Sequence, residues 1–259
     1  MALRSALLFT AVLLSACGAS APSGAEAQTT QMSDEEFDRR LRESLMRNPE
    51  VILEAIEAYR ASLEAEAALA TRESVAGYLS ELVRGEAGHA IGASADEADL
   101  VVVEFFDYHC GFCRSALGDV LALVEGDPGV RVVFQELPIL REESRDAAEI
   151  ALAAAKLDSD AYRKVHQALF QASGVLDDKA IDNAIKRAGL RPSTVRKIAK
   201  EQADAIDATV DRSMEIAQAI GVQGTPFFIV ANPDTGTFDV LEGFRSEEFA
   251  ALVESVRGQ

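Results

Sequence analysis

Residues 100–113 read LVVVEFFDYHCGFC, and this stretch decides the fold. Apart from Glu104, its first seven residues are β-branched, aliphatic or aromatic, a composition that predicts a buried central strand. Cys110 and Cys113 follow, and apolar residues then recur at helical spacing. A Gly-Asp-Pro-Gly turn leads into a second predicted strand at 130–137. Strand, helix and strand at this length predict a right-handed βαβ unit with parallel strands.

The chain downstream changes to a helical pattern and then returns to strands. Four helices are predicted, at 144–157, 160–172, 177–188 and, as one long helix, from Pro192 or Ser193 onward. Two strands and a closing helix follow, at 227–230, 237–241 and 246–256. The sequence therefore predicts an α/β fold in which a helical insertion, about 142–220, separates a βαβ half from a ββα half.

The motif Cys110-Gly111-Phe112-Cys113 is typical of a redox site. Its first cysteine falls at the N-terminus of a predicted helix, where unpaired amides and the helix dipole favour the thiolate that attacks disulfides. Cys113, one turn later and buried, is placed to close a disulfide with Cys110 or to resolve a mixed disulfide. We expect Gly111 and Phe112 to leave the first sulfur exposed. Half of a zinc site has the same spacing, but a second pair is missing and the histidines are scattered, so no metal is expected.

A second motif, Gly224-Thr225-Pro226, stands directly before the strand at 227–230. A proline at the start of a strand removes one donor of the ladder. If the Thr225–Pro226 bond is cis, the backbone of Thr225 lies free beside the thiols and is able to pair with an extended substrate segment. Gly-Thr-Pro alone is a common turn, and its place before the ββα half favours the substrate-binding interpretation.

Three residues near the thiols have two interpretations each. A buried Glu104 has a raised pKa and accepts the proton of the second cysteine; the alternative is an ion-paired carboxylate at an edge. His109 tunes the first thiolate electrostatically, or is a solvated loop residue. Phe112 contacts apolar substrate segments, or covers the disulfide. His166, on a predicted amphipathic helix, is expected to be a packing residue.

Segments 104–113, 136–140 and 222–226 together resemble the DsbA-like thiol-disulfide oxidoreductases of the thioredoxin superfamily. The resemblance covers about 98–257 and implies a thioredoxin fold with an inserted helical domain. The implied site residues are the nucleophile Cys110, the resolving thiol Cys113, the buried acid Glu104 and the substrate-binding loop Thr225-Pro226. The dithiol is itself the redox group, so no cofactor is expected. The implied partners are unfolded or misoxidised exported proteins and a membrane redox partner of the DsbB or DsbD kind.

The two residues between the cysteines differ from those of DsbA, which has Pro-His there. That histidine helps to stabilise the thiolate, so the Gly-Phe pair argues against strong oxidising power and favours an isomerase or reductase. A dithiol oxidase is the alternative within the family, and the reduction potential separates the two. A third hypothesis belongs to another class: a binding protein that holds a soft metal such as Cu(I) with the two thiolates.

Residues 33–85 form a helical segment ahead of this domain. Ser33-Asp34-Glu35-Glu36 is a capping box, and Asn48-Pro49 is predicted as the N-cap and first residue of a second helix. These helices carry an apolar stripe at helical spacing, which is not stable facing water. Its residues are Phe37, Leu41, Leu45, Ile52, Ile56, Tyr59 and Leu63. We expect a homo-oligomer, as the resemblance to the N-terminal helices of ScsC-type members also implies; packing against the main domain is the alternative. Residues 85–98 are polar and glycine-rich, and mark the boundary.

Residues 1–16 predict an export signal, because a positive n-region precedes an apolar run too short to span a bilayer. Leu14-Ser15-Ala16-Cys17 resembles the lipobox of bacterial lipoproteins, in which the cysteine is lipidated, and 17–32 has the composition of a flexible tether. Ala25-Glu26-Ala27 is a competing site for ordinary signal peptidase. Either interpretation places the protein in the periplasm or cell envelope. In the lipobox interpretation a lipid on Cys17 also anchors it to the membrane.

Composition excludes other classes. The 259 residues include 43 acidic and 25 basic ones, for a formal net charge of -18, which repels phosphate backbones, so nucleic acid is not an expected partner. Three cysteines cannot all pair, so the chain is no disulfide-stapled scaffold.

Overall fold

The computed structural model describes residues 32–258. The chain divides into two compact units, Met1–Tyr59 and Arg60–Gln259. Helix α1 (Asp34–Arg47) belongs to the first unit, and helix α2 (Glu50–Arg84) begins there and continues into the second. The Ser33 hydroxyl accepts from the amide of Glu36 and so caps α1, as the sequence predicts.

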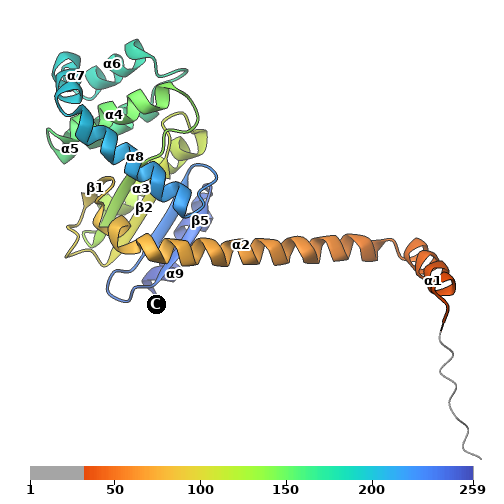
Figure 1. Ribbon diagram of the computed structural model, residues 1–259. Coiled ribbons are helices and arrows are strands. Elements are labelled where there is room, and N and C mark those ends of the chain that lie inside the picture. The colour runs from red at the N-terminus through yellow and green to blue at the C-terminus, as the bar shows by residue number, and fades with distance from the viewer. Residues whose placement is uncertain (1–31, 259) are drawn as a thin grey trace, which may run out of the picture. The chain divides into compact units, whose positions relative to one another are not determined.

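The second unit is built on a five-stranded mixed sheet (Figure 1). Its strands are β1 (His89–Gly92), β2 (Leu100–Phe106), β3 (Val130–Glu136), β4 (Phe227–Ala231) and β5 (Phe238–Glu242), in the order β1-β3-β2-β4-β5. Strands β2 and β3 pair in parallel, and every other pairing is antiparallel. Because β2 is central and all seven of its residues are buried, its carboxyl end is held firmly under the first cysteine.

The helices follow the predicted plan. Helix α3 (Gly111–Gly126) connects β2 to β3, and α9 (Ser246–Arg257) follows β5. Five helices lie between β3 and β4: α4 (Glu143–Ala155), α5 (Ser159–Phe170), α6 (Asp178–Arg187), α7 (Pro192–Glu201) and α8 (Ala203–Ala219). The fold class is therefore confirmed: a thioredoxin fold with an inserted helical domain and an N-terminal helical extension.

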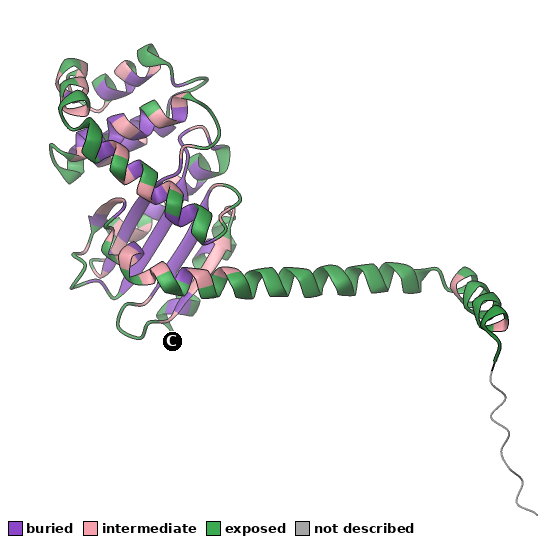
Figure 2. Ribbon diagram, viewed as in Figure 1, coloured by how far each residue is buried: buried purple, intermediate pink, exposed green. Residues whose placement is uncertain are grey.

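Apolar side chains cover both faces of the sheet, and Figure 2 shows most of the central strands coloured as buried. On one face, Val102 and Phe228 pack with residues of α3, α9 and the inserted helices. On the other face, Val103 and Phe105 pack with Leu82 of α2 and with the C-terminal half of α8. Burial of apolar side chains on both faces stabilises the sheet. The thiol site follows the carboxyl end of its central strand, β2.

Three local predictions were wrong. The polar stretch 85–98 contains β1, a short edge strand that pairs antiparallel with β3. The long helix expected from Pro192 is two helices, which break at Gln202. Asn48 is the C-cap of α1, where its backbone N–H bonds the Ser44 carbonyl, and no side-chain cap was found for α2.

The predictions for residues 1–31, namely the export signal, the lipobox at Cys17, the site at Ala25–Ala27 and nearly all of the tether, lie outside the described residues. Within 32–258 no helix is long and apolar enough to cross a membrane.

Candidate active site

The turn between β2 and α3 is fixed by Asp107, a residue that the sequence analysis did not single out. Its buried carboxylate accepts from the amide of His109 at 2.7 Å and from the amides of Ile139 and Leu140 at 2.9 Å each. The same side chain therefore ties the cysteine turn to the loop after β3. The position of Asp107 in the sequence could have indicated this role, because an acidic residue directly after a buried strand needs several hydrogen-bond donors.

Cys110 is the N-cap of α3. Its Sγ accepts from the amide of Cys113 at 3.4 Å and lies 3.1 Å from the carbonyl oxygen of Thr225, to which it donates only in its protonated, thiol form. A hydrogen bond with the Cys113 side chain, helped by the Thr225 side chain and by amides of the first helical turn, lowers the pKa of Cys110 to about 6, although burial opposes this. This cysteine is therefore largely a thiolate at neutral pH.

The expected exposure of the first sulfur was wrong. Cys110 is only 5% exposed. The Thr225 carbonyl covers it from the side of the loop before β4, and the Thr225–Pro226 peptide bond is cis. Phe112, by contrast, is 65% exposed, and Gly111 beside it is exposed as well.

Cys113 has the opposite electrostatic environment. It is fully buried, and burial, the hydrogen bond with Cys110 and the charge of Glu104 raise its pKa far above the ordinary value. Glu104 is itself 2% exposed, and its Oε1 has no hydrogen-bond partner among residues 32–258. Burial first, and the charge of Cys110 second, raise the pKa of Glu104. Two cysteines with oppositely shifted pKa values thus lie above one buried acid.

His109 lies beside this pair but turns away from it. Its Nε2 accepts from the amide of Leu176 at 3.1 Å, so its Nδ1 carries the hydrogen that bonds the Ser144 hydroxyl at 2.8 Å. Burial lowers the pKa of this imidazole, which is therefore neutral at pH 7. A neutral ring lends no positive charge to Cys110, so the geometry supports His109 as a link to the inserted helices and does not support it as an electrostatic tuner.

Comparison with known proteins agrees with this geometry. Residues 101–252 match the family model of the DSBA-like thioredoxin domain. The chain belongs to this family.

Solved structures of DsbA-like relatives cover most of the chain. A thioredoxin-like oxidoreductase from Silicibacter pomeroyi is 33% identical, with a TM-score of 0.59 over 69% of this chain and 96% of that one. Proteus mirabilis ScsC in a transitional conformation is 28% identical, with a TM-score of 0.60 over 86% and 96%. A curated relative, the Na(+)/H(+) antiporter NhaA 1 of Salinispora arenicola, is 27% identical over 147 residues; the match covers 56% of this chain and 22% of that protein, so the chain spans about a fifth of that relative's length.

The DsbA-like domain also contains a buried polar cluster that sequence reasoning missed. Glu136 Oε1 accepts from the hydroxyls of Tyr108 at 3.3 Å and Tyr162 at 3.2 Å, and the Tyr108 hydroxyl lies 2.9 Å from His166 Nδ1. Burial raises the pKa of Glu136 and lowers that of His166 to about 3, so burial favours the neutral form of both groups. The predicted packing position of His166 agrees with its stacking on Tyr162. The cluster joins the cysteine turn to helix α5.

Proposed function

We propose that this protein catalyses thiol-disulfide exchange in exported protein substrates, with Cys110 as the nucleophile and Cys113 as the resolving thiol. The observation that carries the proposal is the opposite shift of the two pKa values: about 6 for Cys110 and far above the ordinary value for Cys113. Only the sulfur of Cys110 is then ionised before substrate binds, and Cys113 remains a protonated thiol until the mixed disulfide has formed.

The exchange proceeds in two balanced steps. The Cys110 thiolate attacks one sulfur of a substrate disulfide; the substrate S–S bond breaks, a mixed disulfide forms and the other substrate sulfur leaves as a thiolate. Cys113 then loses its proton, attacks Cys110 Sγ and releases the first substrate sulfur. The protein ends as a disulfide and the substrate as a dithiol, and the reverse sequence oxidises a substrate.

Glu104 is the group proposed to accept the proton of Cys113. In the dithiol form burial, and second the negative charge of Cys110, raise the pKa of Glu104. The mixed disulfide removes that negative charge, which lowers the pKa of Glu104 at the moment when Cys113 must be deprotonated. The proton that Glu104 gives up passes to solvent, and the resulting carboxylate accepts the proton of Cys113, so the acid acts as a base only after substrate has been captured.

The direction proposed is isomerase or reductase. A Cys110 pKa of about 6 is closer to that of thioredoxin, about 7, than to that of the strong oxidant DsbA, about 3.5. A less stabilised thiolate means a less oxidising disulfide. The proposed partners are misoxidised exported proteins and a membrane protein that keeps the dithiol reduced.

The test combines activity with redox state. The full chain should reduce insulin, and Cys113→Ser should accumulate a mixed disulfide at Cys110, whereas Cys110→Ser should form none. A reduction potential near −120 mV would instead identify an oxidase. Stoichiometric Cu(I) binding without any insulin reduction would replace the proposal by metal binding.

Export and self-association complete the proposal. The pattern of residues 1–31 supports export with a lipid on Cys17. A mass shift of the mature N-terminus that Cys17→Ala abolishes would support this lipidation, and a mature chain that starts at Gln28 would overturn it.

Self-association is supported by apolar side chains of α1 and the first part of α2 that stay exposed, among them Phe37, Leu41, Ile52 and Ile56.

A further inference from the structure

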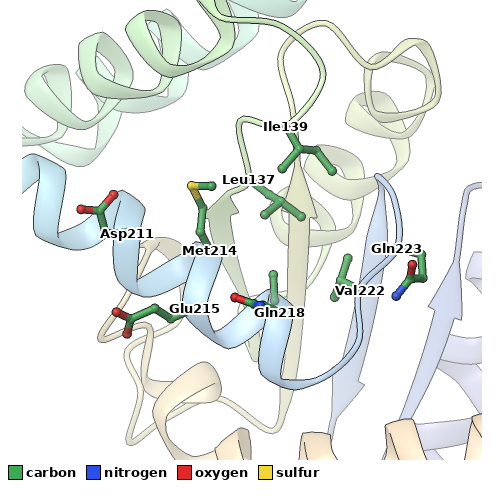
Figure 3. A pocket seen from close by; sticks show the side chains of 9 residues that line it. Leu137, Ile139, Asp211, Met214, Glu215, Gln218, Val222 and Gln223 are labelled. Atoms are coloured by element: carbon green, nitrogen blue, oxygen red, sulfur yellow. The ribbon is translucent and has the colours of Figure 1, made fainter.

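A hollow of about 370 Å³ lies next to the loop that precedes β4. Leu137 and Ile139 line it from the segment after β3, Met214 from α8, and Val222 and Gln223 from the chain that leads to Thr225 (Figure 3). All these residues belong to the second unit, and none was given a role by the sequence analysis.

The hollow lies next to the loop that carries Thr225 of the thiol site. Gln223 is two residues from Thr225, whose carbonyl oxygen lies 3.1 Å from Cys110 Sγ. Since an extended chain spans about 3.5 Å per residue, a substrate segment bound at Thr225 reaches the hollow two or three residues from its own cysteine. The site and the hollow therefore lie within reach of one short segment.

The floor of the hollow is apolar. Leu137 and Ala217 are buried there, and Ile139 is 45% exposed at the edge. Met214 contributes a flexible thioether that adapts to different side chains, and Figure 3 shows it on the side of α8 that faces Leu137. This lining fits one aliphatic side chain rather than a charged one.

The rim on the α8 side is acidic. Asp211 and Glu215 line it, and each is paired with an arginine, Arg145 at 2.8 Å and Arg212 at 3.1 Å. These arginines are shared among a larger number of carboxylates, because Arg145 also pairs with Glu149 and Asp207, and Arg212 with Glu81. In these two ion-pair networks two arginines face five carboxylates, so the networks that include Asp211 and Glu215 carry a net negative charge, which attracts cationic side chains.

From this geometry we propose that the hollow receives an aliphatic side chain of an extended substrate segment that also carries lysine or arginine beside it. The inference rests on the proposed function and narrows its substrate class: cysteines in aliphatic, basic segments are preferred over cysteines in polar or acidic ones. Ile139 and Glu215 act as specificity-determining residues, outside the thiol chemistry itself.

The test uses the reduced full-length protein and ten-residue peptides with one cysteine held as a mixed disulfide with 2-nitro-5-thiobenzoate. Attack by Cys110 on the peptide sulfur releases the coloured thiolate, whose lower pKa makes it the better leaving group. Three peptides are compared, which carry the residue pair Leu-Lys, Leu-Glu or Ser-Lys on both sides of the cysteine. The first residue of each pair lies two residues from the cysteine, and the second lies three residues from it. Leu-Lys should react about tenfold faster than Ser-Lys and, at low salt, about fivefold faster than Leu-Glu.

Matched variants separate the hollow from its surroundings. Ile139→Ser should abolish the leucine preference, whereas Leu140→Ser, the equally exposed next residue outside the lining, should keep it. Glu215→Gln should halve the lysine preference or more; Glu248→Gln, which removes a comparable pair with an arginine three residues earlier, should not.

Reaction with a small symmetrical aromatic disulfide distinguishes the two possible failures. If this reagent reacts normally but all peptides react at one rate, the substrate inference is overturned and the exchange function stands. Equal losses in Ile139→Ser and Leu140→Ser also overturn it. If neither the reagent nor any peptide reacts, the proposed function itself fails.

Discussion

At the scale of single residues, the site depends on burial more than on pairing. Glu104, Cys113 and Glu136 are all buried, and burial is the first cause of each raised pKa. By contrast, the pKa of Cys110 is lowered, first by the hydrogen bond with the Cys113 side chain and then by those from Thr225 and from amides of the first turn of α3. The motif predicted Cys110 at the N-terminus of a helix and Cys113 buried one turn later, and both positions are confirmed. It did not predict the covering of Cys110 or the links of Asp107, which depend on loops distant in sequence.

The proton-accepting role of Glu104 predicts a selective defect. Glu104→Gln should release mixed disulfide about 100-fold more slowly, the size of a general-base effect, while the rate of attack by Cys110 stays within about twofold. Acid-quenched samples separated on non-reducing gels measure both steps. Glu254→Gln, at an exposed position on α9, is the control. Unchanged release in Glu104→Gln contradicts the role.

Glu136 predicts a pH-dependent change in stability. A carboxyl with a raised pKa stabilises the fold fully below its unfolded pKa, about 4.3, and loses that contribution as pH rises through the folded value. Glu136→Gln keeps an acceptor for Tyr108 and Tyr162 without an ionisable proton. Its urea midpoint should match that of the wild type at pH 4 and exceed it increasingly toward pH 8. A difference that is constant with pH would rule out this explanation.

At the scale of elements, the sequence predicted the helices and strands whose apolar residues recur with a clear periodicity. The strand at β2 and the helices α3 to α6 follow from apolar spacing, with Asp158 and Asp177 as N-caps that accept from amides three residues on. Strand β1 could not be predicted from the sequence. It is a four-residue edge strand in a polar stretch, and it forms mainly because it pairs with β3. The break at Gln202 lacks a Gly or Pro signal; both helices pack on α4, but α7 also packs on α6 and α8 also packs on β3.

The end of α2 is predicted to be a structural part of the sheet's cover. Leu82 is fully buried among residues of β2, β4 and α8. Leu82→Ala should lower the free energy of unfolding by about 2–5 kcal/mol, as for other buried leucines. The same substitution at Leu157, which is 42% exposed, should cost less than about 1 kcal/mol. Urea unfolding followed by far-UV circular dichroism measures both, and equal costs would contradict this packing.

At the scale of the whole molecule, the chain combines a DsbA-like domain with a helical segment that buries little by itself. No residue of α1 is buried. An amphipathic helix with an exposed apolar stripe needs a partner, and several dithiols around one substrate suit an enzyme that rearranges disulfides.

Self-association is predicted to depend on that stripe. Leu41→Glu combined with Ile56→Glu should reduce the mass measured by light scattering at tens of micromolar to that of one chain, because both exposed apolar side chains become charged. Arg42→Glu, one residue from the stripe on α1, should leave the mass unchanged, and all variants should keep the reaction with small disulfides. A wild-type protein that is monomeric under these conditions contradicts the prediction.

The most direct test is the pH dependence of Cys110 alkylation in the reduced full-length chain, with the modified residue identified by mass spectrometry. The rate constant for iodoacetamide should rise with a midpoint near pH 6 and level off above it, and the label should lie on Cys110 and not on Cys113. A midpoint near 8.5, the ordinary thiol value, or equal labelling of both cysteines, would contradict the account.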